Sequence, residues 1–199
     1  KLVRYGRPGN RALLVIGVLC IHGGACESAA QFTSYAARTE FLLTPPGVHP
    51  GGLSGFVNPA TLALLQAPEA SATFASAGDR RAVRSDWGWF AALPHIGGGV
   101  LHRRRPGLAN LREARLAIGL GGDDLAVGVG RGWSSTRGQK PPELWIAGVV
   151  YRPSPQWSLA STWTRASGGK GREVAADVGY RPWANDRLTL FGEGVRSND

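Results

Sequence analysis

The chain has 199 residues, a net charge of +9 and 29 glycines, about twice the usual glycine share. A chain of this length can bury a sizeable core in one domain. Glycine within its apolar runs disfavours a helical domain and indicates a curved sheet. The positive charge is compatible with anionic partners but selects none of them.

The N-terminal residues predict an export signal. A basic head is followed by the apolar run 12–21, which is too short to span a membrane as a helix. Ser28-Ala29-Ala30 then offers a cleavage site, so we expect residues 1–30 to be a signal peptide. Two alternatives stay open: a buried core helix or strand, and lipidation of Cys26, because Gly24-Ala25-Cys26 resembles the end of a lipobox.

Both cysteines, Cys20 and Cys26, lie in this N-terminal segment, so no disulfide framework is predicted. If residues 1–30 are removed, the rest of the chain has no cysteine. A chain without cysteine suits an oxidising compartment but does not require one.

Residues 31–67 are predicted to form an N-terminal arm with a short helix. Asn58 has the side chain of a helix cap, and Pro59 suits the first helical position. Leu62 and Leu65 fall on one face of this helix. Such an amphipathic piece must pack against the wall of a sheet or inside a barrel.

Residues 68–199 are predicted to form an antiparallel meander, because large apolar residues alternate with small or charged ones. The expected strands are 69–77, 85–93, 97–104, 112–121, 124–134, 143–152, 157–166, 172–181 and 187–195. In 172–181, for example, Val174 and Val178 share one face while Glu173 and Asp177 share the other. This pattern is typical of a transmembrane barrel strand, although a soluble sandwich has the same period.

The connections between these strands alternate in length, which favours a barrel. Short turns at 94–96, 122–123, 153–156 and 182–186 alternate with longer connections at 78–84, 105–111, 135–142 and 167–171. Outer-membrane barrels alternate short periplasmic turns with longer outer loops, whereas sandwiches have Greek-key crossings. Aromatic residues flank the short turns, as in an interfacial girdle: Tyr151, Trp157, Tyr180 and Trp183.

The predicted fold class is therefore all-β. We expect an up-and-down, outer-membrane-type partial β-barrel of about 8–10 strands with a short N-terminal helix.

No catalytic set, cofactor or metal site is predicted. The histidines share no metal-ligand spacing. Gly52-Leu53-Ser54-Gly55 is similar to a nucleophile elbow, but Phe56 replaces the last glycine of that motif. A Ser/Lys dyad would need Lys140 or Lys170, which lie in glycine- or proline-rich loops.

Arginine clusters beside the longer connections are the candidate anion contacts. They comprise Arg80, Arg81, Arg84, Arg103, Arg104 and Arg105. Guanidinium forks suit phosphates, so we expect contact with membrane lipid or lipopolysaccharide if these loops face outward. The alternative is a solvated loop without a specific partner. Nucleic acid is not expected, because no aromatic-basic binding module accompanies the clusters.

Segments 41–46, 55–63, 86–88 and 120–128 together resemble the region that precedes the protease domains in some bacterial signal peptide peptidase A-like proteins. The similarity covers most of residues 32–195. It implies a parent serine protease with a Ser/Lys dyad that degrades residual signal peptides. No residue here matches that dyad, which would lie beyond Asp199. The Asn-Pro-Ala element at 58–60 also resembles the N-terminal part of fatty-acid-transporter-like outer-membrane barrels.

The leading hypothesis is an exported, non-catalytic, barrel-like region of the bacterial outer membrane, with membrane lipid and its own C-terminal protease region as partners. An odd strand count and an end at Ser197-Asn198-Asp199, without a terminal aromatic, indicate a fragment. The rival hypothesis is a soluble periplasmic β-sandwich that binds an anionic partner through its arginine loops.

Overall fold

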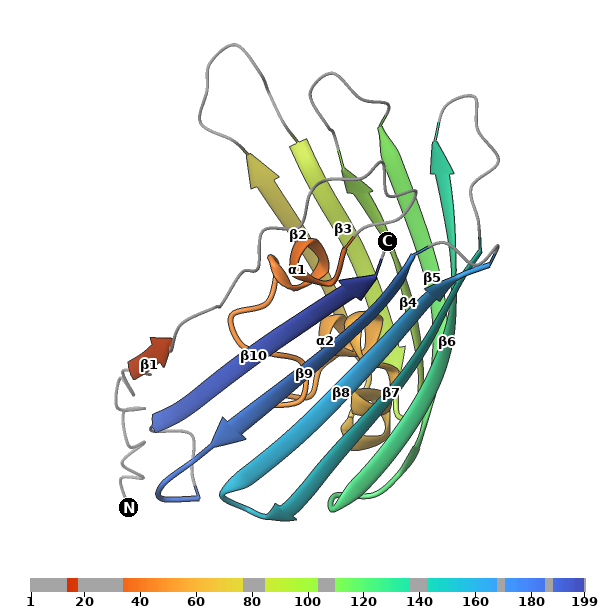
Figure 1. Cartoon of the computed structure of the whole chain (residues 1–199). Helices are drawn as coiled ribbons and strands as arrows, with labels where there is room; N and C mark the ends of the chain where they lie inside the picture. Colours follow the sequence, from red (N-terminus) through yellow and green to blue (C-terminus); the bar gives the residue numbers. More distant parts are fainter. Residues whose placement is uncertain are drawn as a thin grey trace, which may run out of the picture.

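One curved antiparallel sheet makes up most of the fold in a computed structural model of the chain (Figure 1). The structure describes residues 14–17, 34–76, 85–103, 110–136, 143–167, 171–184 and 188–198. Within these ranges, the strands pair in the order β1-β10-β9-β8-β7-β6-β5-β4-β3-β2. Each strand from β2 to β9 thus pairs with its successor in sequence, and the predicted meander is confirmed.

The antiparallel strands lie within three residues of the ranges expected from the alternation of apolar and polar residues. They are β2 (Glu69–Ser76), β3 (Ser85–Leu93), β4 (Ile96–Arg103), β5 (Leu111–Gly121), β6 (Leu125–Thr136), β7 (Glu143–Ser154), β8 (Trp157–Ala166), β9 (Arg172–Tyr180) and β10 (Leu188–Asn198). A further short strand, β1 (Leu14–Gly17), pairs in parallel with β10. The rest of the predicted signal peptide, residues 1–13 and 18–30, lies outside the described residues.

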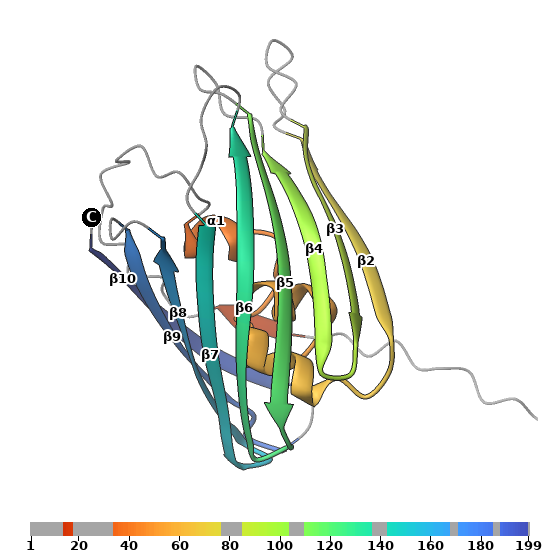
Figure 2. The ribbon, with the colours of Figure 1, turned by 90° about the vertical axis from the view of Figure 1, so that its right-hand side faces the viewer.

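The sheet is open in the part of the chain that the structure describes, because β2 and β10 do not pair with each other. The predicted all-β antiparallel meander is thus confirmed, but within the described residues it is not closed into a barrel. The same residues form one sheet and not the two facing sheets of a sandwich. The concave side is instead filled by short helices (Figure 2).

These helices belong to residues 34–66, which we call the plug. They are α1 (Tyr35–Thr39), α2 (Gly52–Val57) and the 3-10 helix η1 (Pro59–Leu64). The predicted cap is present: the Asn58 side chain accepts a hydrogen bond from the Ala60 N–H at 3.1 Å, and Pro59 begins η1. Plug and sheet share a buried apolar cluster of Tyr35, Phe56, Val57, Phe90, Leu101 and Ala175.

A row of glycines explains how closely η1 approaches the sheet. Gly119, Gly128 and Gly148 lie directly opposite one another on β5, β6 and β7. A Cβ atom on Gly128 would lie 2.4 Å from the carbonyl carbon of Pro59, and one on Gly148 would lie 1.9 Å from Asn58 Oδ1. The helix therefore rests on bare backbone, which accounts for part of the unusual glycine content.

Candidate functional site: an apolar outer face and a polar interior

The convex face of the sheet carries large apolar side chains that no other part of the described structure covers. The exposed ones are Phe74, Trp89, Leu93, Ile96, Val100, Leu116, Ile118, Leu120, Leu125, Val127, Val129, Trp133, Trp145, Tyr151, Trp157, Leu159, Trp163 and Val178. They occupy alternate positions on the strands, and many of the positions between them are buried. Monomeric soluble proteins rarely expose so large a contiguous apolar surface.

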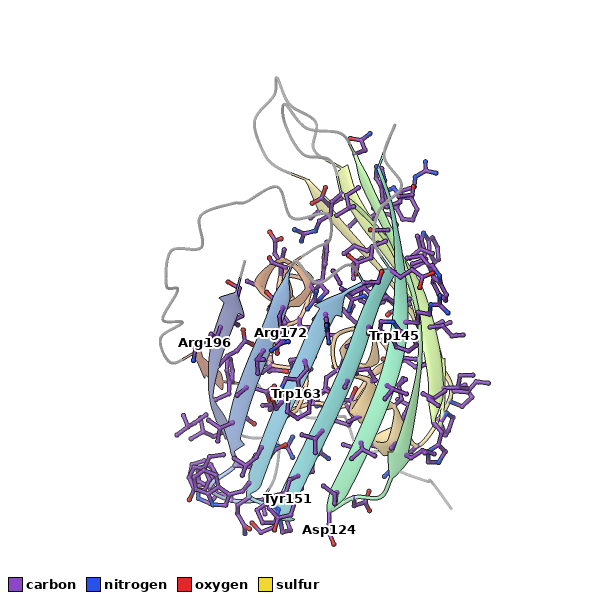
Figure 3. The ribbon with its side chains drawn as sticks, turned by 45° about the vertical axis from the view of Figure 1, so that its right-hand side comes forward. Asp124, Trp145, Tyr151, Trp163, Arg172 and Arg196 are labelled. Atoms are coloured by element: carbon purple, nitrogen blue, oxygen red, sulfur yellow. The ribbon has the colours of Figure 1, made fainter. Side chains whose placement is uncertain are left out.

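Charge on this convex face lies at one end. Among the described strands, its charged side chains are Arg112, Arg131, Glu143, Arg165, Arg172 and Arg196. The first five lie on the halves of their strands that join the longer connections, and Arg196 lies near the C-terminal end of β10. Figure 3 shows Arg172 and Arg196 at one end, while Asp124 and Tyr151 lie at the other. The band between the two ends is free of charge in the strands described.

Aromatic residues lie on both sides of the aliphatic band. At the short-turn end, the Trp157 and Tyr180 rings are 4.5 Å apart. Toward the other end, β6, β7 and β8 present Trp133, Trp145 and Trp163, which sequence analysis did not single out. These three tryptophans follow the same alternation as the other apolar residues of their strands, and that alternation is the sequence signal for their outward position. Trp157 and Trp163 are separated by about 20 Å along the strand.

The concave face is polar and is bonded to the plug. Arg38 of α1 is buried and donates to the Glu173 carboxylate at 3.1 Å and to Thr164 Oγ1 at 3.2 Å. The same carboxylate accepts the Tyr35 backbone N–H at 2.8 Å. Burial, with Asp177 and Glu193 nearby, raises the pKa of the Tyr35 phenol, which stays protonated. These bonds fix α1 to β8 and β9.

A second buried pair fixes α2 to β5. Arg115 donates through Nε to Glu113 at 2.5 Å, and its Nη1 donates to the Phe56 carbonyl at 2.8 Å. Its guanidinium lies 4.6 Å from the centre of the Phe56 ring. Because this paired charge is buried and hydrogen-bonded to the plug, it serves attachment of α2.

Other bonds tether the rest of the plug to the wall. Asn58 Nδ2 donates to the carbonyls of Val149 and Ser161 at 3.4 and 3.3 Å. The Gly52 N–H at the start of α2 donates to Glu69 of β2 at 2.6 Å. Ser158 Oγ donates to the Gly47 carbonyl at 2.5 Å. These bonds and those of α1 and α2 attach the plug to β2, β5, β7, β8 and β9.

Of the predicted anion-contact arginines, the structure describes only Arg103. It lies on the concave face, where it donates to the Glu40 carboxylate at 2.5 Å and also to the Ala37 carbonyl. Its guanidinium also lies 5.5 Å from the centre of the Phe41 ring. Arg103 thus holds the end of α1. The other members of the set, Arg80, Arg81, Arg84, Arg104 and Arg105, lie outside the described residues.

No catalytic arrangement emerges from the residues described. Ser54, of the elbow-like segment, is buried in α2 and donates to the His49 carbonyl at 2.8 Å. No group of three or more potential metal-ligating side chains is found in the described ranges. Within them, no helix has the length and apolarity needed to cross a membrane.

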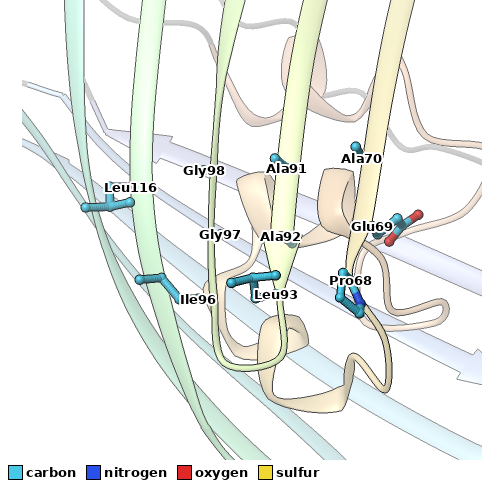
Figure 4. Close-up of a pocket in the computed structure, with 10 residues that line it drawn as sticks. All are labelled: Pro68, Glu69, Ala70, Ala91, Ala92, Leu93, Ile96, Gly97, Gly98 and Leu116. Carbon is cyan, nitrogen blue, oxygen red and sulfur yellow. The ribbon is translucent and has the colours of Figure 1, made fainter.

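An open apolar hollow of about 490 Å³ lies at the lower ends of β2, β3 and β4 (Figure 4). Small residues form its floor and larger apolar ones its sides: Ala70, Ala91, Gly98, Leu93, Ile96 and Leu116. Its carboxylate, from Glu69, is already bonded to Gly52. The hollow can accept an apolar group but offers no chemistry.

Comparisons with protein-family models, with curated proteins and with solved structures each gave no match. The functional conclusion therefore depends on the geometry of the two faces.

Proposed function

We propose that this chain is a non-catalytic wall of a bacterial outer-membrane protein, with its convex face in lipid and its concave face sealed by the plug. The observation that carries this proposal is the inversion of the two faces. Apolar side chains point outward, while Glu113, Arg115 and Glu173 are buried inside. Transmembrane barrels have this arrangement, apolar toward lipid and polar within.

The stagger of the hairpins supports the same proposal. Ile96, beside the β3–β4 turn, lies level along the register with Ile118, Val129, Ala147 and Trp163. Trp163 is six residues from the start of β8, so the turns shift by about 20 Å across four strand spacings of about 4.8 Å. If the turns share one plane, the strands tilt by about 45°, the tilt of transmembrane β-strands.

Export and an outer-membrane location belong to this proposal, and the basis for export is the predicted signal at 1–30. A parent peptidase similar to signal peptide peptidase A stays a prediction based on resemblance, as does kinship with fatty-acid-transporter-like barrels. The wall proposal needs neither, because it depends on the sheet alone.

A charge placed in the middle of the convex face tests the proposal. Val129 and Leu125 share one strand and one face and are 50% and 52% exposed, but Leu125 lies at the short-turn end. In a bilayer, V129R should lower the free energy of unfolding by about 2–4 kcal/mol and L125R by about 1 kcal/mol or less. The measurement is urea unfolding of the chain reconstituted in phosphatidylcholine vesicles.

A soluble protein would behave differently. An exposed substitution on a water-facing sheet usually changes stability by about 0.5 kcal/mol or less, so V129R and L125R would then match the wild type. That result, together with a monodisperse chain in buffer without detergent, would overturn the wall proposal.

A further inference from the structure

Three arginines that lie apart in sequence meet on the convex face. Arg165 of β8 lies directly opposite Arg172 of β9. Arg196 of β10 lies opposite Val174, two residues along β9 from Arg172 and on the same face. All three side chains are exposed, and within the described residues none of them forms an ion pair. We call these residues the arginine triad.

Within the described residues, no ion pair compensates the positive charge of the triad. Side chains directly opposite in an antiparallel pair have Cβ atoms about 5 Å apart, and like charges there repel. The neighbouring carboxylate on this face, Glu143, already pairs with Arg131. A bound anion between Arg165 and Arg172 would remove the repulsion. Guanidinium forks bind phosphate oxygens in a bidentate manner, so phosphate is the anion that suits them best.

The surface beside the triad suits an acyl chain. Trp163 lies opposite Val174, two residues along β8 from Arg165. Figure 3 shows Trp163 below Arg172. Farther toward the short turns, Ala176, Gly194 and Gly192 are small outward residues on β9 and β10, and the apolar Val178 lies opposite Gly192. A Cβ atom on Gly194 would meet no atom within 4 Å. A smooth apolar strip therefore leads away from the three cations.

We infer that the arginine triad binds the phosphate of a phosphorylated membrane lipid, whose acyl chain lies along the strip of Ala176, Gly192 and Gly194. This inference depends on the proposed function, because it needs the convex face to lie in lipid. The three arginines of this site differ from the arginine clusters that the sequence predicts as anion contacts beside the longer connections. A free phosphate would share the headgroup chemistry but not the acyl strip.

The test titrates the full chain in dodecyl maltoside micelles with diphosphorylated lipid A and measures the bound fraction by native mass spectrometry. R172Q should weaken binding about tenfold, the effect of losing one hydrogen-bonded charge pair. The matched control is R112Q, which removes the same charge from the convex face of β5, and it should change binding less than about twofold. R172K, which keeps the charge but loses the fork, should fall between them.

Three results would overturn the inference. Equal losses in R172Q and R112Q would mean attraction to net charge alone. Equal binding of a dephosphorylated lipid would mean contact through acyl chains alone. Complete displacement of the lipid by millimolar inorganic phosphate would identify a free-anion site. The circular dichroism spectrum of each variant shows whether it is folded. Failure of the triad leaves the V129R result unchanged, so it is distinguishable from failure of the wall proposal.

Discussion

Replacing Gly128 by alanine should separate the plug from the wall. The added Cβ atom would lie 2.4 Å from the Pro59 carbonyl carbon, 2.5 Å from the Ala60 nitrogen and 2.7 Å from the Pro59 oxygen. All three are backbone atoms of buried residues, so no side chain can rotate away. Ordinary contact begins at 3.4 Å, and η1 must therefore move by about 1 Å.

This displacement has two energetic consequences. Overpacking of a buried contact costs about 1–3 kcal/mol. Moving η1 also stretches the bonds from Asn58 Nδ2 to Val149 and Ser161, which are already 3.4 and 3.3 Å long, and the loss of one costs about 1 kcal/mol. We expect G128A to lower the free energy of unfolding by about 2–4 kcal/mol, equivalent to a fall of about 5–15 °C in Tm.

The assay is thermal unfolding in dodecyl maltoside, followed by circular dichroism of the sheet. G194A is the matched control, because it makes the same change in a strand where a Cβ atom has open space. Limited digestion with trypsin adds a local measurement: cleavage after Arg38, which is buried in α1, should accelerate in G128A only. A G128A protein as stable and as resistant to trypsin as G194A would refute this close-packing reasoning.

Two further predictions concern the buried ion pair and the outward tryptophans. E173Q leaves the Arg38 charge buried without its carboxylate and should lower the free energy of unfolding in urea by about 3–5 kcal/mol. The control E143Q removes a pair in which the Arg131 and Glu143 side chains are 42% and 43% exposed, and it should lower that free energy by about 1 kcal/mol or less. Equal effects of the two variants would contradict the attachment role of Glu173. The second test uses a variant in which Trp163 is the only tryptophan left. In vesicles, lipids brominated on the acyl chain should quench the fluorescence of Trp163. Unquenched emission would mean that the Trp163 side chain lies away from lipid.

The strands could be predicted because their signal is local. Alternation with a period of two places every second side chain on one face, and turn residues mark where each strand ends. The cap at Asn58 was likewise predictable, since its bond to Ala60 spans two residues. Helix α2 was missed because Gly52 and Gly55 disfavour a helix. It forms through contacts that are distant in sequence, such as the Phe56–Phe90 ring pair at 4.9 Å.

The arginines show the limit of reading clusters along a chain. Arg103 was grouped with Arg104 and Arg105, but its position on β4 turns it to the concave face, where it bonds to α1. Arg165 and Arg172 form no cluster along the chain, because each is isolated from other arginines in the sequence. The pairing of β8 with β9 brings them together. Charge clusters in a sheet are therefore a property of register, which local sequence specifies poorly.

The two faces of the sheet also bear on what surrounds it. A sheet must bury its apolar face against a second layer. On the concave side that layer is the plug, and its bonds to Glu69 of β2 and Glu173 of β9 link distant parts of the open sheet. The convex face is the more apolar one, yet no element of the described residues covers it. Lipid can supply that second layer over the whole face, and the charge-free aliphatic band is the part of the face that would lie against the acyl chains.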